Sequence, residues 1–394
     1  MNIAMLTSDF FPNIGGIASH IFYLSRALID FGHHVIVVHV HATDKDEGPY
    51  LNHTHVANVP VVEVMYRRSS TVVGRQISFI YAAGLGINMA RKLLGRIDII
   101  HHHDMHPSFI PNMRKWRNEG LRWVWTNHSS QFLTAYQSLV LRKVIQVFHY
   151  SVDGIISVSS EIHEKTRRLF PRKLAAFIPN GVDISIFSPA RNVQREKLGL
   201  DKDAFVVLCP RRMVPKNGVI YLAQAIEIVL RTLQGERIQF VFLGSDPACN
   251  TDAAYIRQVK AVLSPLQRIG RVVFLGNVPW YQMADVNAAA DLVVIPSLIE
   301  AVSLSALEAM ASAKPVIATN IGGLRDLINH RENGILVDPA SPQQLAHAIV
   351  ELFKDSHLRT KIAEGGLATV RNSFTWEVIA RRTLEFYQQC GITG

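Results

Sequence analysis

The sequence has few cysteines and no long apolar run, and these absences narrow the class of protein. Three cysteines in 394 residues, Cys209, Cys249 and Cys390, match no metal-binding or redox spacing, which favours a reducing compartment. No run of about 18 apolar residues is present, so we expect no transmembrane helix. Residues 1–6 lack the basic segment of a signal peptide. We therefore predict a cytoplasmic protein and leave open a peripheral position at the inner membrane face.

The chain also lacks the G-x-G-x-x-G fingerprint of dinucleotide-binding folds, which disfavours a nicotinamide-dependent dehydrogenase. After the first predicted strand stands a loop containing Gly15 and Gly16, which leads into a predicted helix. Glycines let the backbone approach a ligand closely, so we predict a ligand site at this loop. The alternative is a tight turn with only a structural role.

The seventeen histidines do not predict a metal site. His101, His102 and His103 are consecutive, with His106 close behind. Consecutive side chains on a strand point to opposite faces, so these histidines cannot all bind one ion. We predict no metal site.

The chain carries a net charge of +9, and its basic clusters lie in the first half. The clusters are Arg67-Arg68, Arg91-Lys92, Arg114-Lys115 with Arg117, Arg167-Arg168 and Arg172-Lys173. Nucleic-acid binding would bring interleaved aromatic residues or a known module, and the sequence has neither. Two interpretations stay open: attraction to an anionic membrane surface or acceptor, and a solvated basic surface.

The length suits two domains, and strands alternate with helices in both halves. The pattern predicts an α/β protein with two Rossmann-like, doubly wound parallel sheets. We place the domains at residues 1–189 and 190–372, with a C-terminal helix at 373–394. Ligands of such sheets bind beyond the carboxyl ends of the strands, so two facing sheets would share an interdomain cleft.

One segment carries most of the functional information. It runs from Pro296 to Ala311 and places Glu300 and Glu308 eight positions apart, after an apolar strand. Helical spacing begins near Ser303, so Glu300 lies at the bend before a helix start and Glu308 inside the helix. Free N–H groups at a helix start suit a phosphate, and the acids could hold hydroxyl-rich groups on either side of it. The alternative is two solvated acids near a helix start.

This segment resembles the donor-site signature of retaining glycosyltransferases of family 4, which have the GT-B fold. The signature reads Pro-Ser, two variable residues, Glu, seven residues and Glu-Ala, followed by a small-residue turn and Pro-Val, here Pro315-Val316. The resemblance implies an acceptor-binding first domain and a second domain that binds a nucleotide sugar. It also implies that the C-terminal helix, with Trp376 in the family's usual position, crosses back to the first domain.

The resemblance assigns roles within this segment. Glu308 is expected to bind ribose hydroxyls, and Glu300 a hydroxyl of the donor sugar. The backbone amides of Val302, Ser303 and Leu304 would hold phosphate. The common family form has Gly-Phe-Gly at 301–303, where this chain has Ala-Val-Ser. The backbone amides are the same in both sequences, and the Ser303 hydroxyl could add a hydrogen-bond donor.

A second segment, Arg211 to Gly218, resembles the family's Arg-Leu-x-x-x-Lys-Gly phosphate-binding stretch. Aligning Arg212 and Gly218 leaves Asn217 where the family has Lys, with Lys216 one place earlier. We assign Arg212 and Lys216 to the pyrophosphate, where fixed cations would stabilise the departing nucleotide. Three further loops are expected on the donor side. They comprise Gly15 and Gly16, Gly244, and Asn277 with Val278, the last pair beside the nucleobase.

In the first half, the family shows His-x-His at the end of a strand, with one histidine touching the transferred sugar. We choose His103, which with Arg212, Lys216 and Glu300 completes the expected catalytic set. On the acceptor side the resemblance suggests Asn13, Asp104, Asn127 and His128. A strand-end histidine satisfied by backbone groups is the competing interpretation of His103.

The resemblance implies a retaining, metal-independent transferase without a cofactor. It would move a hexose of glucose or N-acetylglucosamine type from a nucleotide sugar, most often UDP-linked, to an acceptor hydroxyl. Residues 8–21 and 64–66 also resemble the enzyme that transfers N-acetylglucosamine to phosphatidylinositol, which suggests a lipid or glycan acceptor. Two alternatives stay open: a GT-B sugar-nucleotide epimerase and a catalytically silent sugar-nucleotide binding protein.

Overall fold

The computed structural model describes residues 1–11, 15–44, 48–103, 105–128, 130–244 and 252–391. It divides into two compact units. Unit 1 comprises Met1–Gly181 and Trp376–Gly394, and unit 2 comprises Val182–Thr375. Within the residues that the structure describes, no helix could span a lipid bilayer.

The chain changes unit at 181 and 375, whereas the sequence placed the boundaries at 189 and 372. Gly181 packs against the indole of Trp376, where an added Cβ would lie 2.7 Å from the ring. One residue further on, the Val182 N–H donates to the Phe374 carbonyl (2.8 Å). The two crossings are therefore fixed side by side, and the later turn-forming residues up to Pro189 belong to unit 2.

Unit 1 is built on an eight-stranded sheet in the order β3-β4-β2-β1-β5-β6-β7-β8. All neighbours are parallel except the antiparallel pair β3 and β4. The strands are β1 (Asn2–Thr7), β2 (His34–Thr43), β3 (Tyr50–Val56), β4 (Val59–Arg67), β5 (Ile99–His102), β6 (Arg122–Asn127), β7 (Gly154–Ser157) and β8 (Leu174–Phe177). The sequence did not predict the β3–β4 hairpin, which turns through Ala57 at a positive φ of 49°.

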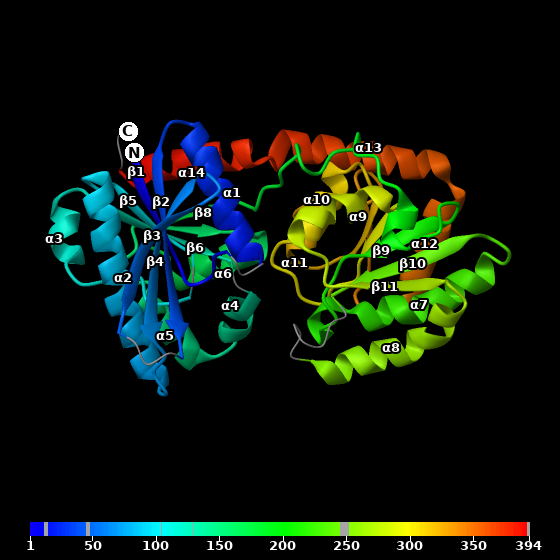
Figure 1. Ribbon diagram of the computed structural model, residues 1–394, viewed down its shortest axis with the longest axis horizontal. Helices are drawn as coiled ribbons and strands as arrows, with labels where there is room; N and C mark the ends of the chain where they lie inside the picture. The colour runs from blue at the N-terminus through cyan, green and yellow to red at the C-terminus, as the bar shows by residue number, and fades with distance from the viewer. Residues whose placement is uncertain (12–14, 45–47, 104, 129, 245–251, 392–394) are drawn as a thin grey trace. The chain divides into compact units, whose positions relative to one another are not determined.

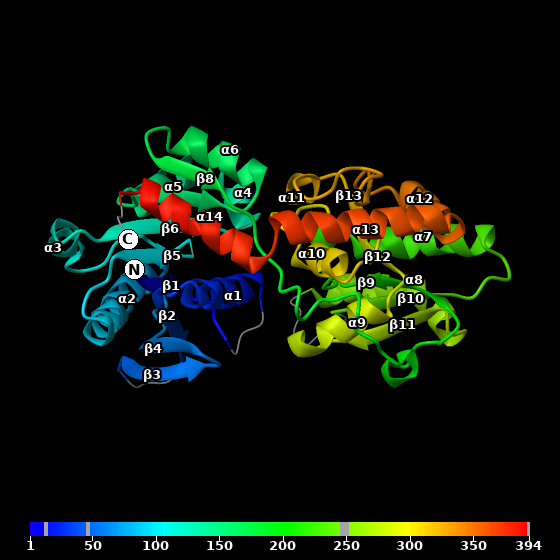
Figure 2. The same ribbon diagram turned by 90° about the horizontal axis from the view of Figure 1, so that it is seen from above.

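The helices of unit 1 lie on both faces of this sheet (Figures 1 and 2). They are α1 (Gly16–Asp30), α2 (Val72–Leu94), α3 (Met113–Asn118), α4 (Ser130–Ala135), α5 (Leu139–Phe148), α6 (Ser160–Leu169) and α14 (Trp376–Gln389). Helices α1 and α14 share one core with β1, in which Ile3 and Met5 pack with Ile21 and Phe386. The C-terminal helix is thus part of the core of unit 1.

Unit 2 contains a six-stranded parallel sheet in the order β11-β10-β9-β12-β13-β14. Its strands are β9 (Phe205–Cys209), β10 (Ile238–Leu243), β11 (Val272–Gly276), β12 (Leu292–Ile295), β13 (Val316–Thr319) and β14 (Ile335–Val337). Its helices are α7 (Val219–Thr232), α8 (Ala253–Arg268), α9 (Met283–Ala289), α10 (Leu304–Ala311), α11 (Gly322–Arg325), α12 (Pro342–Lys354) and α13 (Ser356–Ser373). The doubly wound α/β architecture predicted for both halves is confirmed.

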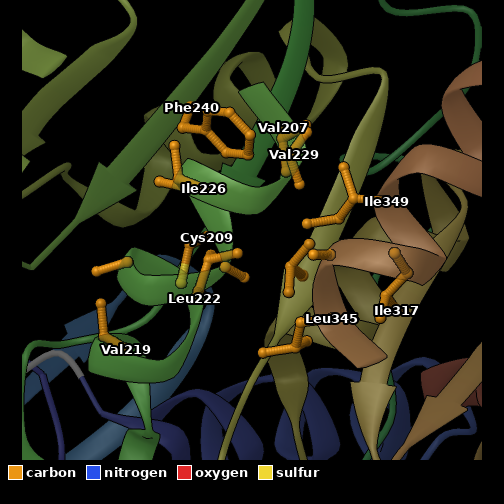
Figure 3. Packing of buried hydrophobic residues seen from close by; sticks show 14 of the residues in the cluster. Val207, Cys209, Val219, Leu222, Ile226, Val229, Phe240, Ile317, Leu345 and Ile349 are labelled. Carbon is orange, nitrogen blue, oxygen red and sulfur yellow. The ribbon is translucent and has the colours of Figure 1, made fainter. Parts of the chain in front are cut away.

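Apolar side chains cover the sheet of unit 2 on both faces. On one face, Val207 and Ile317 of the strands pack with Leu222 of α7 and Ile349 of α12 (Figure 3). On the other face, Val293 and Leu307 belong to a second cluster that includes α9 and α10. Strands buried on both faces read as continuous apolar runs, which is why they were identifiable in the sequence. Polar residues of this sheet therefore concentrate where the strands end.

Candidate functional site

The polar residues singled out in the second half follow the carboxyl ends of neighbouring strands. Strand order places β10, β9, β12 and β13 side by side, so the loops after them share one edge of the sheet. Arg211 and Arg212 follow β9, Gly244 follows β10, and Glu300 follows β12. The structure thus gathers these residues within unit 2.

Glu300 forms an ion pair with Arg211, not with Arg212. The two side chains are only 14% and 13% exposed, and Arg211 Nη2 also donates to Asn217 Oδ1 (2.9 Å). A largely buried pair of this kind holds its carboxylate in one orientation, because a lone buried charge would be costly. Sequence reasoning missed Arg211. The signal available was the doublet Arg211-Arg212 directly after a strand, but the sequence did not indicate which arginine points to the acid.

Arg212 and Lys216 are exposed, and among the described residues neither has an ion-pair partner. Asn217, at the position where the family has Lys, is buried and donates from Nδ2 to the Arg212 carbonyl (2.9 Å). It therefore supports the loop internally. The predicted cations Arg212 and Lys216 remain free to meet an anion at this edge.

Two backbone contacts fix the Lys216 loop against the Glu300 loop. The N–H groups of Leu298 and Ile299 donate to the Lys216 carbonyl (2.8 and 3.3 Å). Gly218 has a φ of +63°, and a Cβ there would lie 1.9 Å from the Pro296 carbonyl oxygen. Only glycine fits such an approach, so the loop geometry depends on it.

Gly244 plays a similar part after β10, with a φ of +63° and space for a Cβ blocked by the Arg212 Cα at 2.6 Å. Its carbonyl accepts from the Met213 N–H (3.1 Å), and its N–H donates to the Gly276 carbonyl (2.8 Å). Asn277, which follows β11, is exposed, and Val278 is half-buried. These predicted donor-side residues therefore belong to the same connected set of loops.

Helix α10 begins at Leu304, with Ser303 as its N-cap. The Ser303 Oγ is buried and accepts from the Ala306 N–H (3.3 Å), which leaves the hydroxyl proton as a donor. Close by, the Gly323 N–H donates to the Glu300 carbonyl (3.2 Å), and α11 can approach this closely because Gly323 has no Cβ, which would lie only 1.7 Å from the Ala301 carbonyl oxygen. The amides of Val302, Ser303 and Leu304 lie at the start of a helix, where the dipole favours an anion.

Glu308 lies in the second turn of α10 and is partly buried. Burial raises the pKa of its carboxyl group to about 7. Within the described parts of the chain, no hydrogen bond or ion pair engages that carboxyl group. A poorly solvated acid without a protein partner can accept hydrogen bonds from ligand hydroxyls.

In unit 1, Gly15 is the extended N-cap of α1, and Gly16 is the first helical residue. A Cβ on Gly15 would lie 3.2 Å from Asp9 Oδ2, so the loop passes close to this acid. Burial raises the pKa of Asp9. Asn13 and Asp104, both predicted on the acceptor side, lie outside the described residues.

His103 follows β5 and is buried, with both ring nitrogens engaged. Nδ1 lies 3.1 Å from His128 Nε2, and Nε2 lies 3.4 Å from the sulfur of Met5. His128 is partly exposed, while its neighbour Asn127 is buried. The competing interpretation of His103 expected backbone partners, but the structure shows side-chain partners. Its contact with a sugar stays a prediction.

A cluster of buried histidines surrounds His103. His20 of α1 bonds through Nδ1 to Asn180 Oδ1 (2.8 Å), and its ring lies 4.4 Å from that of His128. His101 bonds to the Tyr387 hydroxyl of α14 (2.6 Å). Desolvation lowers the pKa of each of these imidazoles, so they are neutral near pH 7. Sequence reasoning missed His20, Asn180 and Tyr387, because partners 160 and 286 positions apart leave no local pattern.

His102 points to the opposite face of the sheet, as alternation on a strand predicts. Its Nδ1 lies 3.0 Å from Ser108 Oγ, which in turn bonds to His149 (2.7 Å). His149 stacks on Trp125 with ring centroids 3.6 Å apart. His101 and His103 therefore belong to one cluster of buried polar side chains, and His102 belongs to another on the opposite face of the sheet.

Comparison with known proteins agrees with this arrangement. A family model described as Glycosyltransferase Family 4 matches residues 14–186, and one described as Glycosyl transferases group 1 matches residues 190–368. Two doubly wound units of these families define a GT-B glycosyltransferase, a class that uses nucleotide-sugar donors. The chain belongs to glycosyltransferase family 4.

Relatives and solved structures align over nearly the whole chain. An uncharacterised glycosyltransferase of Methanocaldococcus jannaschii is 27% identical over 98% of both chains. The phosphatidylinositol N-acetylglucosaminyltransferase GPI3 subunit of Saccharomyces cerevisiae is 26% identical, over 100% of this chain and 84% of that one. Sucrose-phosphate synthase from Thermosynechococcus elongatus superposes with a TM-score of 0.77 (23% identity, 98% of both chains). HepE from Anabaena, in complex with UDP and glucose, superposes with a TM-score of 0.72 (20% identity, 98% of this chain and 99% of that one).

Proposed function

We propose that the protein is a retaining hexosyltransferase that uses a UDP-linked sugar of glucose or N-acetylglucosamine type. The observation that carries this proposal is the arrangement around the start of α10. The Glu300–Arg211 pair lies on one side, and the carboxyl group of Glu308 lies within the helix. Arg212 and Lys216 stand at the same sheet edge, and among the described residues neither they nor the Glu308 carboxyl group has an ion-pair partner. A diphosphate flanked by a sugar and a ribose has matching chemistry.

In this proposal Arg212 and Lys216 neutralise the diphosphate, together with the amides of Val302, Ser303 and Leu304. Glu308 accepts hydrogen bonds from the ribose hydroxyls. Glu300 accepts one from the donor sugar, with Arg211 fixing its orientation. Gly244, Asn277 and Val278 shape the nucleobase side through backbone contacts.

The transfer breaks the bond between the anomeric carbon and the phosphate oxygen and forms one to the acceptor oxygen on the same face. The acceptor proton passes to the leaving phosphate, whose growing charge the fixed cations stabilise. Glu300 is already paired with Arg211, so this acid orients the donor and is not assigned as a nucleophile. His103, neutral at pH 7, would hydrogen-bond the sugar by exchanging one of its two side-chain partners, His128 or Met5, for a sugar hydroxyl. No cofactor or metal enters this step.

UDP as the donor nucleotide is supported by structural neighbours of this fold that hold UDP, such as HepE. A lipid or glycan acceptor is supported by the phosphatidylinositol N-acetylglucosaminyltransferase relatives. A panel of UDP-, GDP- and ADP-sugars scored by thermal shift tests the donor, because a ligand of the folded state raises the unfolding temperature. Stabilisation by none of them would contradict the proposal.

Product analysis separates the alternatives. Incubation with the stabilising sugar nucleotide and no acceptor should give at most slow release of free hexose and UDP. An isomerised sugar nucleotide would instead favour an epimerase. Binding without hydrolysis or transfer to lipid and glycan acceptors would favour a silent binding protein.

We further propose that unit 1 rests on an anionic membrane surface that presents the acceptor. On α5, Leu139, Val140 and Val147 are 73%, 71% and 67% exposed, and Lys143 of the same helix is also exposed. No acidic residue occurs between Glu119 and Asp153. Exposed apolar side chains beside basic ones suit the boundary between head groups and acyl chains.

Flotation with vesicles containing phosphatidylserine should carry the wild-type protein upward, and neutral vesicles should carry less. The variant Val140→Glu/Val147→Glu should lose most of this binding. Val262→Glu, at an apolar residue of unit 2 that is 42% exposed, is the matched control and should float like the wild type. Equal flotation of both variants would contradict membrane contact through α5.

A further inference from the structure

Two histidines and a glutamate to which the proposed transfer assigns no role converge in unit 1. His39 and His41 lie on β2, and Glu63 lies on the adjacent strand β4, where it pairs in register with His39. One potential ligand atom of each residue lies within 4.8 Å of the other two. Figures 1 and 2 show β2 and β4 side by side. Rigid neighbouring strands therefore hold all three side chains on one face of the sheet.

The hydrogen bonding of His39 engages one ring nitrogen and leaves the other available as a ligand atom. A backbone group of Ser8 bonds to the ring, while Nε2 is buried and has no hydrogen-bond partner within the described part of the chain. His39 is only 3% exposed, so water does not compensate this nitrogen. A backbone carbonyl on one ring nitrogen fixes the tautomer and leaves the other as a lone pair, which is the usual outer-shell arrangement of a metal ligand.

The other two residues complete a mixed nitrogen and oxygen donor set. His41 Nε2 lies 3.0 Å from Glu63 Oε1, and these side chains are 31% and 27% exposed. A divalent ion can replace the proton shared by such a pair, and partial exposure gives it access. The stacked rings of His39 and His41, 4.5 Å apart and tilted by 15°, keep the imidazoles together.

We propose that His39, His41 and Glu63 form a binding site for a divalent transition-metal ion of the zinc class. Two imidazoles and one carboxylate match the ligands that Zn²⁺ accepts, and three protein ligands leave a tetrahedral ion one open position. That position would take water or an oxygen of a ligand at the carboxyl edge of this sheet. The site is independent of the proposed transfer reaction, which assigns no role to these residues.

The cluster of His20, His103 and His128 is the rival site, since one ring nitrogen of each also lies within 4.8 Å of the others. It offers three neutral imidazoles and no carboxylate to balance a dication. Two of its residues, His20 and His103, are buried, whereas His41 and Glu63 are reachable from solvent. Charge and access therefore favour the site on β2 and β4.

The test is a titration of metal-free protein with Zn²⁺ against a chelating indicator, repeated with Co²⁺ followed by its visible absorption. The wild type should bind one equivalent. His41→Ala and Glu63→Gln should each weaken binding by roughly a hundredfold or more, because loss of even an outer-shell partner costs about 10–100-fold. Unfolding curves in EDTA show whether each variant is folded. If His41→Ala does not fold, Glu63→Gln still tests the site, because it keeps the shape of the side chain.

His53→Ala/His55→Ala is the matched control. Both histidines are exposed on β3. They point to the face of the sheet opposite to Glu63, because they alternate along the strand with Asn52, which pairs with Glu63. This control should bind Zn²⁺ like the wild type. His128→Ala reports on the rival site and should also retain binding. The proposal is overturned by absence of stoichiometric binding, by unchanged binding in His41→Ala and Glu63→Gln, or by loss in His128→Ala alone.

Discussion

Glu308 and Glu300 are eight residues apart, yet the fold gives them different electrostatic environments. Glu300 is paired with Arg211, whereas the carboxyl group of Glu308 is partly buried and has no partner among the described residues. Burial raises the pKa of Glu308 to about 7. A carboxyl group with this pKa is stabilised in its neutral form until a ligand supplies donors. At the residue scale, therefore, Glu308 is the side chain most altered by ligand binding.

The raised pKa of Glu308 predicts a pH-dependent cost to stability. The unfolded chain has the ordinary pKa near 4.5. The folded state thus binds the proton of Glu308 more tightly than the unfolded state does. This contribution to the free energy of unfolding is complete below pH 4.5 and is lost as the pH rises toward 7. Glu308→Gln should be more stable than wild type by about 2–3 kcal/mol at pH 8, with little difference at pH 4.5.

Urea unfolding of both proteins at the two pH values measures this difference. Glu236→Gln, at an exposed glutamate of the same unit, should show almost none. A difference between Glu308→Gln and wild type that does not grow with pH would contradict the raised pKa.

At the scale of elements, the site depends on loops that touch backbone to backbone. The Lys216 loop bonds to Leu298, and Gly218 lies against the Pro296 carbonyl. These contacts place the loop after β9 beside the loop after β12, and they use few side-chain atoms. A sequence motif therefore identifies the loops without revealing how tightly they fit.

Replacing Gly218 with alanine should separate the two loops. Gly218 and Gly235 both have a positive φ (63° and 84°), but only Gly218 has an atom within 4 Å of an added Cβ. Gly235→Ala should lose about 1 kcal/mol through backbone strain. Gly218→Ala should lose a further 1–3 kcal/mol from the clash and should also bind UDP more weakly. Equal unfolding free energies for the two variants, measured in urea, would contradict this packing.

How much of the structure the sequence predicts depends on whether the signal is local. The apolar strand predicted before Glu300 is present at Leu292–Ile295, and it was recognisable because both of its faces are buried. The β3–β4 hairpin was missed, since β3 is mostly exposed and carries polar residues such as His53 and His55, so it does not resemble a buried strand. In the site, Glu300 and Glu308 were identifiable from a motif. Their different partners were not, because an ion pair with Arg211 joins residues 89 positions apart.

At the scale of the whole molecule, unit 1 contains an unusual number of buried histidines. Burial lowers the pKa of His20 to about 4 and that of His149 to about 3, and it lowers the pKa of His101, His102 and His103 well below 6.5. All are neutral at pH 7 in the folded chain. As the pH falls, these histidines therefore bind protons in the unfolded chain before they do so in the folded chain.

This imbalance predicts acid sensitivity of unit 1. The stability that neutral histidines contribute is complete above pH 6.5 and is lost as pH falls toward 4, because only the unfolded chain binds the extra protons. The unfolding free energy should fall by several kcal/mol between pH 7 and pH 5. Four of the five tryptophans, all except Trp280, belong to unit 1, so tryptophan fluorescence reports its unfolding. A free energy that is constant over this range would contradict neutral buried imidazoles.

The central claim is that the start of α10 and the cations beside it form the donor site. Calorimetric titration of UDP into wild type, Glu308→Ala and the exposed control Glu236→Ala tests it most directly. We predict saturable binding to wild type and control, and affinity at least about tenfold lower for Glu308→Ala, since two charge-assisted hydrogen bonds would be lost. Equal affinity of Glu308→Ala and wild type, or no binding of UDP, GDP or ADP to the wild type, would contradict the account.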